Sequence, residues 1–382
     1  MGHNPLRPTN ETRAMTTRYP ELGCYALPGH ISQPRDALQE IQDAERLGFG
    51  SVWISERFSA KNADVLSGVA AVLAPSMGIA AGLIQNMPLR NPIVTAGYAA
   101  TMAKLTGDKF ALGVGRGTDS FAVAAGIPKS NFKIMEDYIS ILRTLWRGEA
   151  VNYEGPVGRF AGLRLGVDLP VIPPVFMGAM GEKTLKWAGR VCDGVLFNSL
   201  WTVDAVARSS ALVRQGAEEA GRDPASVRIW TILVSALDVP EEAMLRYVVR
   251  RMNTYIVFPA LIDGICEANR WDKQEAVRLR AALAELDKKR PAKGTMGDES
   301  TTRDLDDLRR MRDLYPRAWI EDGNAIGTGE QGARAVIARL EAGADGVLLH
   351  GSSPRELAGM LAAYGNLRPA NVRQRNVNPG LR

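Results

Sequence analysis

The sequence contains little that could crosslink the chain or bind a metal ion. It has only three cysteines, Cys24, Cys192 and Cys266, and three histidines. Cysteines at these spacings match no zinc motif and form no disulfide framework. Cys24 and Cys192 lie beside apolar runs that are typical of strands, so we expect buried, reduced thiols. The sequence therefore predicts no metal site, and a chain of this length can bury a large core without disulfides.

Long apolar runs and clusters of basic residues are also missing. No run is long enough to cross a membrane, and residues 1–20 are polar, without the apolar stretch of a secretory signal. The formal net charge is +5, but lysine and arginine are spread over the whole chain. Proteins that bind nucleic acids usually concentrate their basic residues on one face. We therefore expect a cytoplasmic protein that binds neither membranes nor nucleic acids.

Short apolar runs alternate with amphipathic segments along the chain. Gly48 ends the first amphipathic segment and an apolar strand follows it, and this join recurs at residues 190–197 and 342–349. Eight strands are predicted, at residues 22–27, 51–55, 77–84, 109–114, 174–177, 194–198, 227–234 and 345–350. An alternation of this length predicts an α/β fold, a closed (β/α)8 TIM barrel, with an open doubly wound sheet as the alternative.

Two stretches interrupt the alternation. Residues 149–170 are rich in glycine and proline, and we expect a loop insertion over the mouth of the barrel. Residues 240–322 are highly charged and helical in pattern, which predicts a helical insertion after strand 7 that forms a lid or an oligomer contact. The predicted organisation is a polar leader at 1–20, a single barrel domain at 21–367 and a tail at 368–382.

Two glycine-rich segments follow predicted strands. Residues 113–119 come at the end of strand 4 but do not match the dinucleotide fingerprint, because the third glycine falls one position early. Residues 177–184 lead from strand 5 into a helix and do not match the P-loop pattern. Free N–H groups at the start of a helix bind phosphate. The second segment therefore predicts a phosphate site, and a plain turn is the alternative for both.

Polar side chains at the ends of the strands are candidates for catalysis, because a TIM barrel has its active site at that face. Glu56 follows strand 2, where it could act in catalysis or pair with Arg57 at the rim. His30 follows strand 1 and His350 ends strand 8, and a structural role is the alternative for each. We prefer His30, because the end of strand 8 is commonly occupied by structural or phosphate contacts.

Several stretches, in this order, resemble the luciferase-like monooxygenase superfamily. The most diagnostic are residues 90–92 (Arg-Asn-Pro), 99–105 and 109–117 with its Leu-Gly-Val-Gly core. Residues 145–155 and 188–194 add support. The resemblance covers roughly residues 20–200 and 325–365 and leaves the helical insertion uncovered. Within the superfamily the chain is most similar to the branch that uses the deazaflavin coenzyme F420, which implies a barrel oxidoreductase.

The resemblance implies where the cofactor lies. Members of this branch have a non-proline cis peptide in strand 3, which matches the bond Gly82–Leu83, and an acidic position beside the deazaflavin, which matches Glu56. The implied cofactor-binding residues are Glu56, Gly82, Leu83, Ile84, Gly115, Thr118, Ala179, Met180 and Gly181. Glu56, Asp119 and His30 are, in this order, our candidates for the acid that assists hydride transfer.

The chain departs from the sugar-phosphate dehydrogenases of this branch at three positions. Arg57 replaces a histidine, Thr118 a glutamate, and Trp201 a lysine that binds the substrate phosphate. We therefore expect hydride transfer between F420 and a small organic substrate other than a sugar phosphate. The predicted pocket is apolar or aromatic, formed by Trp201, Tyr25, Leu27, Phe121 and Met177. The resemblance also implies a homodimer.

Three other functions stay open. An FMN-dependent monooxygenase of the same superfamily would activate oxygen with a reduced flavin from a partner, and the identity of the cofactor separates it from the first hypothesis. A non-catalytic flavin-binding protein would bind the cofactor without turnover. A nucleic-acid-binding protein is suggested only by the positive net charge.

Overall fold

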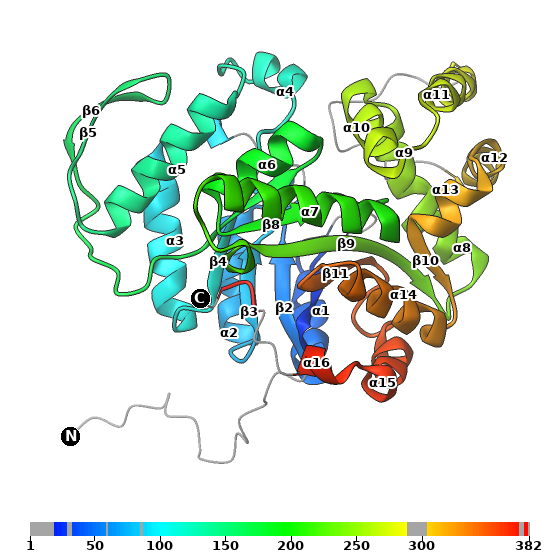
Figure 1. Ribbon diagram of the computed structural model, residues 1–382. Helices are drawn as coiled ribbons and strands as arrows, with labels where there is room; N and C mark the ends of the chain where they lie inside the picture. Colours follow the sequence, from blue (N-terminus) through cyan, green and yellow to red (C-terminus); the bar gives the residue numbers. More distant parts are fainter. Residues whose placement is uncertain are drawn as a thin grey trace, which may run out of the picture.

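Eight parallel strands close into a barrel, shown in the computed structural model of Figure 1. The structure describes residues 19–28, 33–58, 60–84, 87–288, 304–373 and 378–380. The barrel strands are β1 (Tyr19–Tyr25), β2 (Phe49–Ile54), β3 (Gly78–Ala81), β4 (Phe110–Val114), β7 (Val175–Ala179), β8 (Gly194–Phe197), β9 (Arg228–Leu237) and β11 (Gly346–Gly351). The ring closes because β9 pairs with both β8 and β11, and β11 with β1. The predicted TIM barrel is confirmed, and every predicted strand overlaps an observed one.

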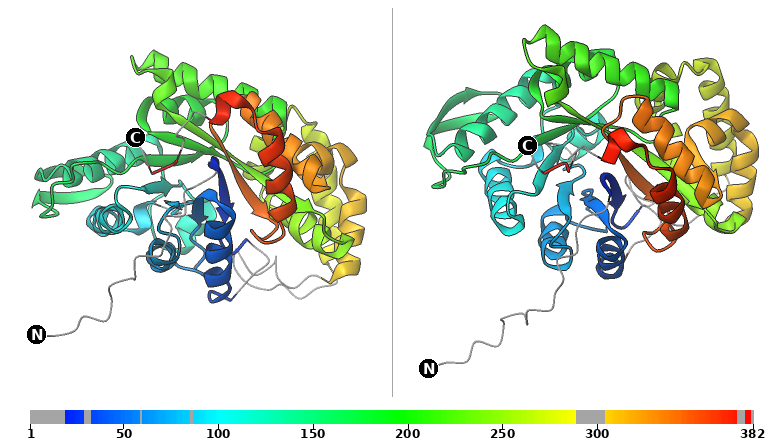
Figure 2. Two further views of the ribbon diagram at one scale, coloured as in Figure 1. Left: turned by 90° about the horizontal axis from the view of Figure 1, so that it is seen from below. Right: turned by 60° about the horizontal axis from the view of Figure 1, so that its bottom comes forward.

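Helices lie between the strands and cover the outside of the barrel (Figure 2). The main ones are α1 (Asp36–Leu47), α2 (Ala63–Leu73), α3 (Pro92–Thr106), α5 (Phe132–Trp146), α6 (Glu182–Val191), α7 (Val203–Glu219), α14 (Gly329–Glu341) and α15 (Ala358–Leu367). Shorter ones are η1 (Met87–Leu89), α4 (Asp119–Ala124), η2 (Pro224–Ser226) and α16 (Ala370–Arg373). No helix in the part that the structure describes is long and apolar enough to span a membrane.

The inside of the barrel is filled by large side chains. Trp53 lies at its centre, with ring centroids 5.6 Å from Phe176 and 5.2 Å from Trp230. A second and larger apolar core lies between the strands and the surrounding helices. Because strands of this kind are buried on both faces, they read as continuous apolar runs, which is why the sequence shows them clearly.

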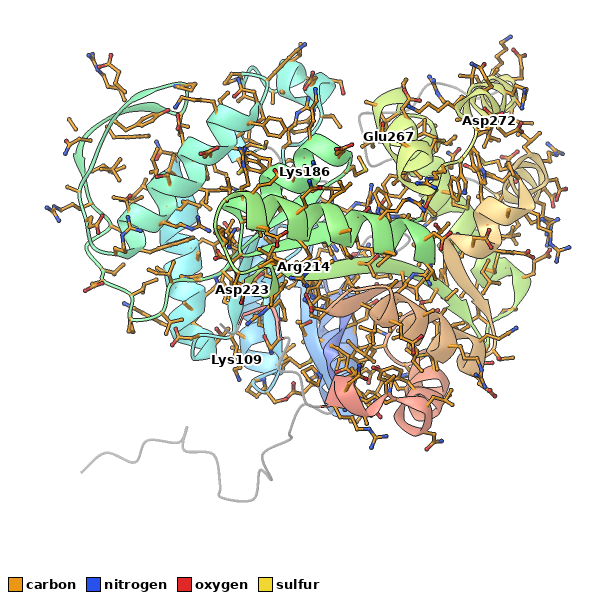
Figure 3. The ribbon with its side chains drawn as sticks, viewed as in Figure 1. Lys109, Lys186, Arg214, Asp223, Glu267 and Asp272 are labelled. Atoms are coloured by element: carbon orange, nitrogen blue, oxygen red, sulfur yellow. The ribbon has the colours of Figure 1, made fainter. Side chains whose placement is uncertain are left out.

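The repeated join between helix and strand is held by the same set of bonds at two places. Asp193 precedes β8, and its Oδ2 accepts hydrogen bonds from a backbone N–H of β7 and from Arg143, both at 2.9 Å. Asp345 precedes β11 and accepts from a backbone N–H of β9 at 2.8 Å and from Arg214 at 2.9 Å. Arg214 is labelled on α7 in Figure 3. These bonds help to fix the register of the neighbouring strands.

The segment expected as a loop over the barrel mouth forms a hairpin elsewhere. Strands β5 (Val151–Gly155) and β6 (Gly158–Leu163) pair antiparallel and extend beside α5, away from the rest of the barrel (Figure 1). The Tyr153 hydroxyl donates to Asp137 of α5 at 2.7 Å. The segment follows a helix, and connections from helix to strand run along the N-terminal face of a barrel, not along its mouth.

The helical insertion lies on the opposite side of the barrel from this hairpin (Figure 1). Its described elements are α8 (Glu241–Met244), η3 (Leu245–Val249), α9 (Arg250–Ile256), α10 (Pro259–Asn269), α11 (Lys273–Asp287), α12 (Leu305–Leu314) and α13 (Arg317–Asp322). A short strand that we did not predict, β10 (Asn324–Gly327), then pairs with β9. The insertion therefore returns to the barrel wall before α14 begins.

Part of the predicted tail is built into the barrel. The Asn378 side chain donates to the Gly50 carbonyl at 3.3 Å, and the guanidinium of Arg228 donates to the Asn378 carbonyl. Residues 378–380 thereby lie against the N-terminal ends of β2 and β9. This segment lies at the end of the barrel opposite the face where TIM barrels have their active sites.

Candidate active site

The floor of the barrel mouth is formed by Leu83. Its side chain lies over three glycines, and a Cβ on Gly113 would come 2.8 Å from Leu83 Cδ2, one on Gly115 would come 3.5 Å from Cδ1, and one on Gly178 would overlap Cδ1. The bond Gly82–Leu83 is cis, which confirms the expectation from the resemblance. Glycines at these positions leave room for the Leu83 side chain, and we call this apolar part of the mouth the Leu83 floor.

A buried ion pair lies beside this floor. The Glu56 N–H donates to the Leu83 carbonyl at 3.1 Å, and the Glu56 side chain, 2% exposed, pairs with Arg90. Arg90 also pairs with Asp64 at 2.6 Å. Burial would lower the pKa of Arg90, but the hydrogen bond to Asp64 and the charge of Glu56 raise it. The alternative in which Glu56 pairs with Arg57 is therefore wrong. The sequence shows Arg90 only as part of a family motif and does not predict its pairing with Glu56.

Tyr25 and Lys61 occupy the neighbouring part of the mouth. The Tyr25 hydroxyl donates to the Gly82 carbonyl. The Lys61 Nζ lies 5.1 Å from the centre of the Tyr25 ring and donates to the carbonyls of Ala26 and Leu27. Burial and the charge of Arg57 lower the pKa of Lys61 well below its usual value. The sequence analysis did not select Lys61, because no motif includes it.

Glu40 of α1 is the acidic side chain that acts on Lys61. Its Oε2 accepts a hydrogen bond from the Leu27 N–H at 2.7 Å, and the side chain is 7% exposed. Burial raises the pKa of Glu40 from 4.5 to about 7, although the Leu27 N–H and Lys61 act in the opposite direction. A buried carboxyl group of this kind makes folding dependent on pH.

Wild type is expected to lose stability as the pH rises from about 4.5 to about 7, and Glu40→Gln should not show this loss. In that range Glu40 binds more protons in the folded protein than in the unfolded chain. Its contribution to the free energy of unfolding is therefore largest below pH 4.5 and falls as the pH rises. The total loss is roughly 3 kcal/mol. Urea unfolding at pH 5 and pH 7.5 measures it, with the surface variant Glu330→Gln as control. An equal change in the free energy of unfolding between pH 5 and pH 7.5 in wild type and Glu40→Gln would contradict this assignment.

The turn between β7 and α6 leaves open space beside Gly181. Gly181 precedes α6 with φ of 72°, and a Cβ there would meet no atom within 4 Å. No side chain caps the N-terminus of α6, so its first N–H groups can bind an anion. Ala179 ends β7, and Met180 contacts α10 at Gly264 and the Asn198 side chain.

The turn after β4 differs from the one after β7. The Thr118 hydroxyl accepts from the Phe121 N–H at 3.3 Å and so caps α4. Asp119 pairs with Arg116 and, at 3.9 Å, with Lys129, and its side chain is 47% exposed. The Gly115 N–H donates to the Ile84 carbonyl at 2.8 Å, and the Gly115 carbonyl accepts from the Met87 N–H at 3.4 Å. This turn therefore has less capacity for an anion than the turn before α6.

Other residues selected from the sequence lie where the structure indicates a role in packing, or lie outside the described residues. Ile84 is 1% exposed and bridges to Val114, so its side chain belongs to the core. His350 is buried, with its ring 4.8 Å from that of Tyr25. His30 lies outside the described residues. In the part of the chain that is described, no group of His, Cys, Asp and Glu side chains could hold a metal ion.

The expected apolar lining is largely part of the core. Trp201 is fully buried, and its Nε1 donates to the Ser209 hydroxyl at 3.0 Å. Met177 and Leu27 are also buried in the core. Phe121 is partly exposed and stacks on Phe58 with ring centroids 5.6 Å apart. The substitution at Trp201 therefore gives no support to an aromatic pocket.

Comparison with known sequences finds F420-dependent enzymes. The chain is 31% identical over 200 residues to 5,10-methylenetetrahydromethanopterin reductase of Methanolobus tindarius, which is 51% of this chain and 59% of that protein. It is 29% identical over 180 residues to F420-dependent glucose-6-phosphate dehydrogenase of Amycolatopsis mediterranei, covering 44% and 54%. The chain spans about half the length of the curated relatives it matches.

Comparison with solved structures supports the barrel fold. F420-dependent tetrahydromethanopterin reductase from Methanopyrus kandleri superposes with a TM-score of 0.70 at 20% identity, over 90% of this chain and 97% of that one. EDTA monooxygenase from Chelativorans sp. superposes with 0.63 at 15% identity, over 96% and 98%. A model of the luciferase-like monooxygenases matches residues 12–346, and the chain therefore belongs to the luciferase-like monooxygenase family.

Proposed function

We propose that this protein is an F420-dependent oxidoreductase that transfers a hydride between the deazaflavin and a small organic molecule. The observation that carries the proposal is the Leu83 floor with the buried pair of Glu56 and Arg90 beside it. An apolar floor suits a planar ring, and a buried charged pair at its edge can orient that ring. The sequence relatives whose names include F420 support this choice of cofactor.

The residues present fit such a cofactor. Ala179, Met180 and Gly181 would hold its phosphate at the open N-terminus of α6, where a Cβ on Gly181 would fill free space. The Leu83 floor would support the ring. The deazaflavin supplies a carbon atom that accepts or gives up a hydride. The protein would bind and orient the cofactor, and the Leu83 floor would exclude water from one face of the ring.

Glu56 is the first of our three acid–base candidates. It is buried beside the Leu83 floor, where it pairs with Arg90. Asp119 is half exposed and paired with Arg116, so it lies in a more hydrated environment. His30 stays a prediction from the sequence. Exchange of a proton with the substrate would typically contribute 10²–10⁴-fold to the rate.

The second candidate is an FMN-dependent monooxygenase, which the fold similarity to EDTA monooxygenase favours. Titration of the purified protein with F420 and, separately, with FMN distinguishes the two by the fluorescence of each cofactor. We expect micromolar or tighter binding of F420 and no response to FMN. Preference for FMN would overturn the proposed function and direct the work to oxygen-dependent assays.

We also propose that the protein acts as a cytoplasmic homodimer on a substrate other than a sugar phosphate. The neighbouring helices α2 and α3 expose four large apolar side chains, Val65, Val72, Val94 and Leu105, by 55–76%. Apolar side chains gathered on neighbouring helices are typical of a protein–protein contact. Light scattering during size-exclusion chromatography measures the mass, and 41.4 kDa would identify a monomer.

A further inference from the structure

Four basic side chains gather at one side of the barrel mouth. Arg57 and Lys61 follow β2 and are joined by backbone hydrogen bonds of 3.0 and 2.7 Å. Arg250 and Arg251 begin α9, in the helical insertion. The charge of Arg251 acts on both Lys61 and Tyr25, and that of Arg57 acts on Arg250. We call these four residues the mouth cation cluster.

The charge of Glu40 acts on Lys61, but the three arginines of the mouth cation cluster have no carboxylate partner among the described residues. None of its members forms an ion pair with a described carboxylate, and buried Nη2 of Arg250 and Nε of Arg251 donate no hydrogen bond to a described residue. Arg250 is only 4% exposed. Burial, with the charges of Arg246 and Arg57, lowers the pKa of Arg250 to about 10. Buried charges without partners reduce stability, so an arrangement of this kind is expected where a ligand provides the partner.

The part of the cluster beside Tyr25 lies across the mouth from the open turn before α6, whereas Arg250 and Arg251 follow β9. In the closed ring of strands, β7, which leads to that turn, is opposite β1, whose last residue is Tyr25. Lys61 lies over the Tyr25 ring, and Arg251 lies 4.7 Å from the centre of the Tyr255 ring. A cofactor whose phosphate binds at α6 and whose ring lies on the Leu83 floor would therefore leave the part of the cluster beside Tyr25 free for a second ligand.

We propose that the mouth cation cluster binds a carboxylate or phosphate group of the substrate. This inference rests on the proposed function, because it places the substrate between the cluster and the deazaflavin. Guanidinium groups bind both anions through paired hydrogen bonds, and burial strengthens these bonds. Arg57 and Arg250 provide the charge, and Lys61 adds a donor close to Tyr25. The substrate is thus an organic anion that is held at a point away from its reacting carbon.

Calorimetric titration with inorganic phosphate and with succinate, at constant ionic strength, tests the proposal. It is made with and without saturating F420, on wild type, Arg57→Gln and Arg250→Met. We expect at least one of the two anions to bind wild type, and both variants to bind it at least tenfold more weakly. F420 affinity should stay within twofold. Arg250→Met should also raise the melting temperature, because it removes a buried charge without a partner, which a purely structural arginine would not do.

Arg309→Gln is the matched control, because Arg309 is on α12 of the same insertion and pairs with exposed Glu241. It should leave anion binding unchanged. No binding of either anion to wild type, or equal binding by wild type and variants, would overturn the proposal. Weaker F420 binding with unchanged anion binding would assign the cluster to an acidic group of the cofactor and overturn it as well. If wild type binds the anions through the cluster but does not bind F420, the cluster stands and the proposed function fails.

Discussion

Gly113→Ala is expected to destabilise the protein by about 3 kcal/mol or more, enough to prevent folding of a marginally stable barrel. A Cβ at this position would overlap the Ala81 carbonyl oxygen and come 2.8 Å from Leu83. The Ala81 carbonyl belongs to the backbone of β3, so the strand itself would have to move. That movement would break the hydrogen bond of 2.9 Å from the Ile84 N–H to the Gly113 carbonyl. Urea unfolding followed by circular dichroism measures the change.

Gly68→Ala is the control with the opposite expected sign. Gly68 lies within α2, and a Cβ there would meet no atom within 4 Å. Alanine in a helix is more favourable than glycine by roughly 0.5–1 kcal/mol, so the variant should be slightly more stable than wild type. If both substitutions changed stability by similar small amounts, β3 and β4 would not pack as closely as described, and the account of the Leu83 floor would fail with them.

The barrel could be predicted from the sequence because each of its strands and helix ends is marked by residues that are neighbours in the chain. Each strand is a short apolar run, and Gly48 ends α1 with φ of 84°, as the sequence indicated. The hairpin at residues 149–170 was missed because glycine and proline suggested a loop, whereas Tyr153 and Phe160 pair across its two strands. The bound position of Asn378 could not be predicted either, because its partner Gly50 lies 328 residues away.

The candidate site was only partly predictable, for the same reason. The glycines around Leu83 lie at the ends of β4 and β7 or directly after β4, and the turn before α6 follows β7, so their place at the mouth could be inferred from the order of elements. The pairing of Glu56 with Arg90 joins the end of β2 to the start of α3. The sequence alone cannot rank this pairing above one between Glu56 and the adjacent Arg57. Arg250 and Arg251 lie in a charged insertion where the sequence offers no reason to prefer any arginine. Only folding brings these charges together.

Arg90→Met is expected to cost about 3–5 kcal/mol, because it removes the cation that pairs with the buried Glu56 carboxylate. Glu56→Gln should cost less, roughly 1–3 kcal/mol, since Arg90 keeps its bond of 2.6 Å to Asp64. The double variant should recover a large part of the loss caused by Arg90→Met. Urea unfolding of the four proteins gives the coupling energy between the two residues.

F420 affinity separates the structural role of this pair from its role in the site. If Glu56 contacts the cofactor, Glu56→Gln weakens F420 binding at least tenfold while the protein stays folded, a change of about 1.4 kcal/mol. Asp64→Asn is the matched control: Asp64 pairs with the same arginine but is 31% exposed, and it should change neither affinity nor stability by more than about 1 kcal/mol. Equal F420 binding by wild type and Glu56→Gln would show that the pair only holds β2 to α3, and another group would then have to orient the ring.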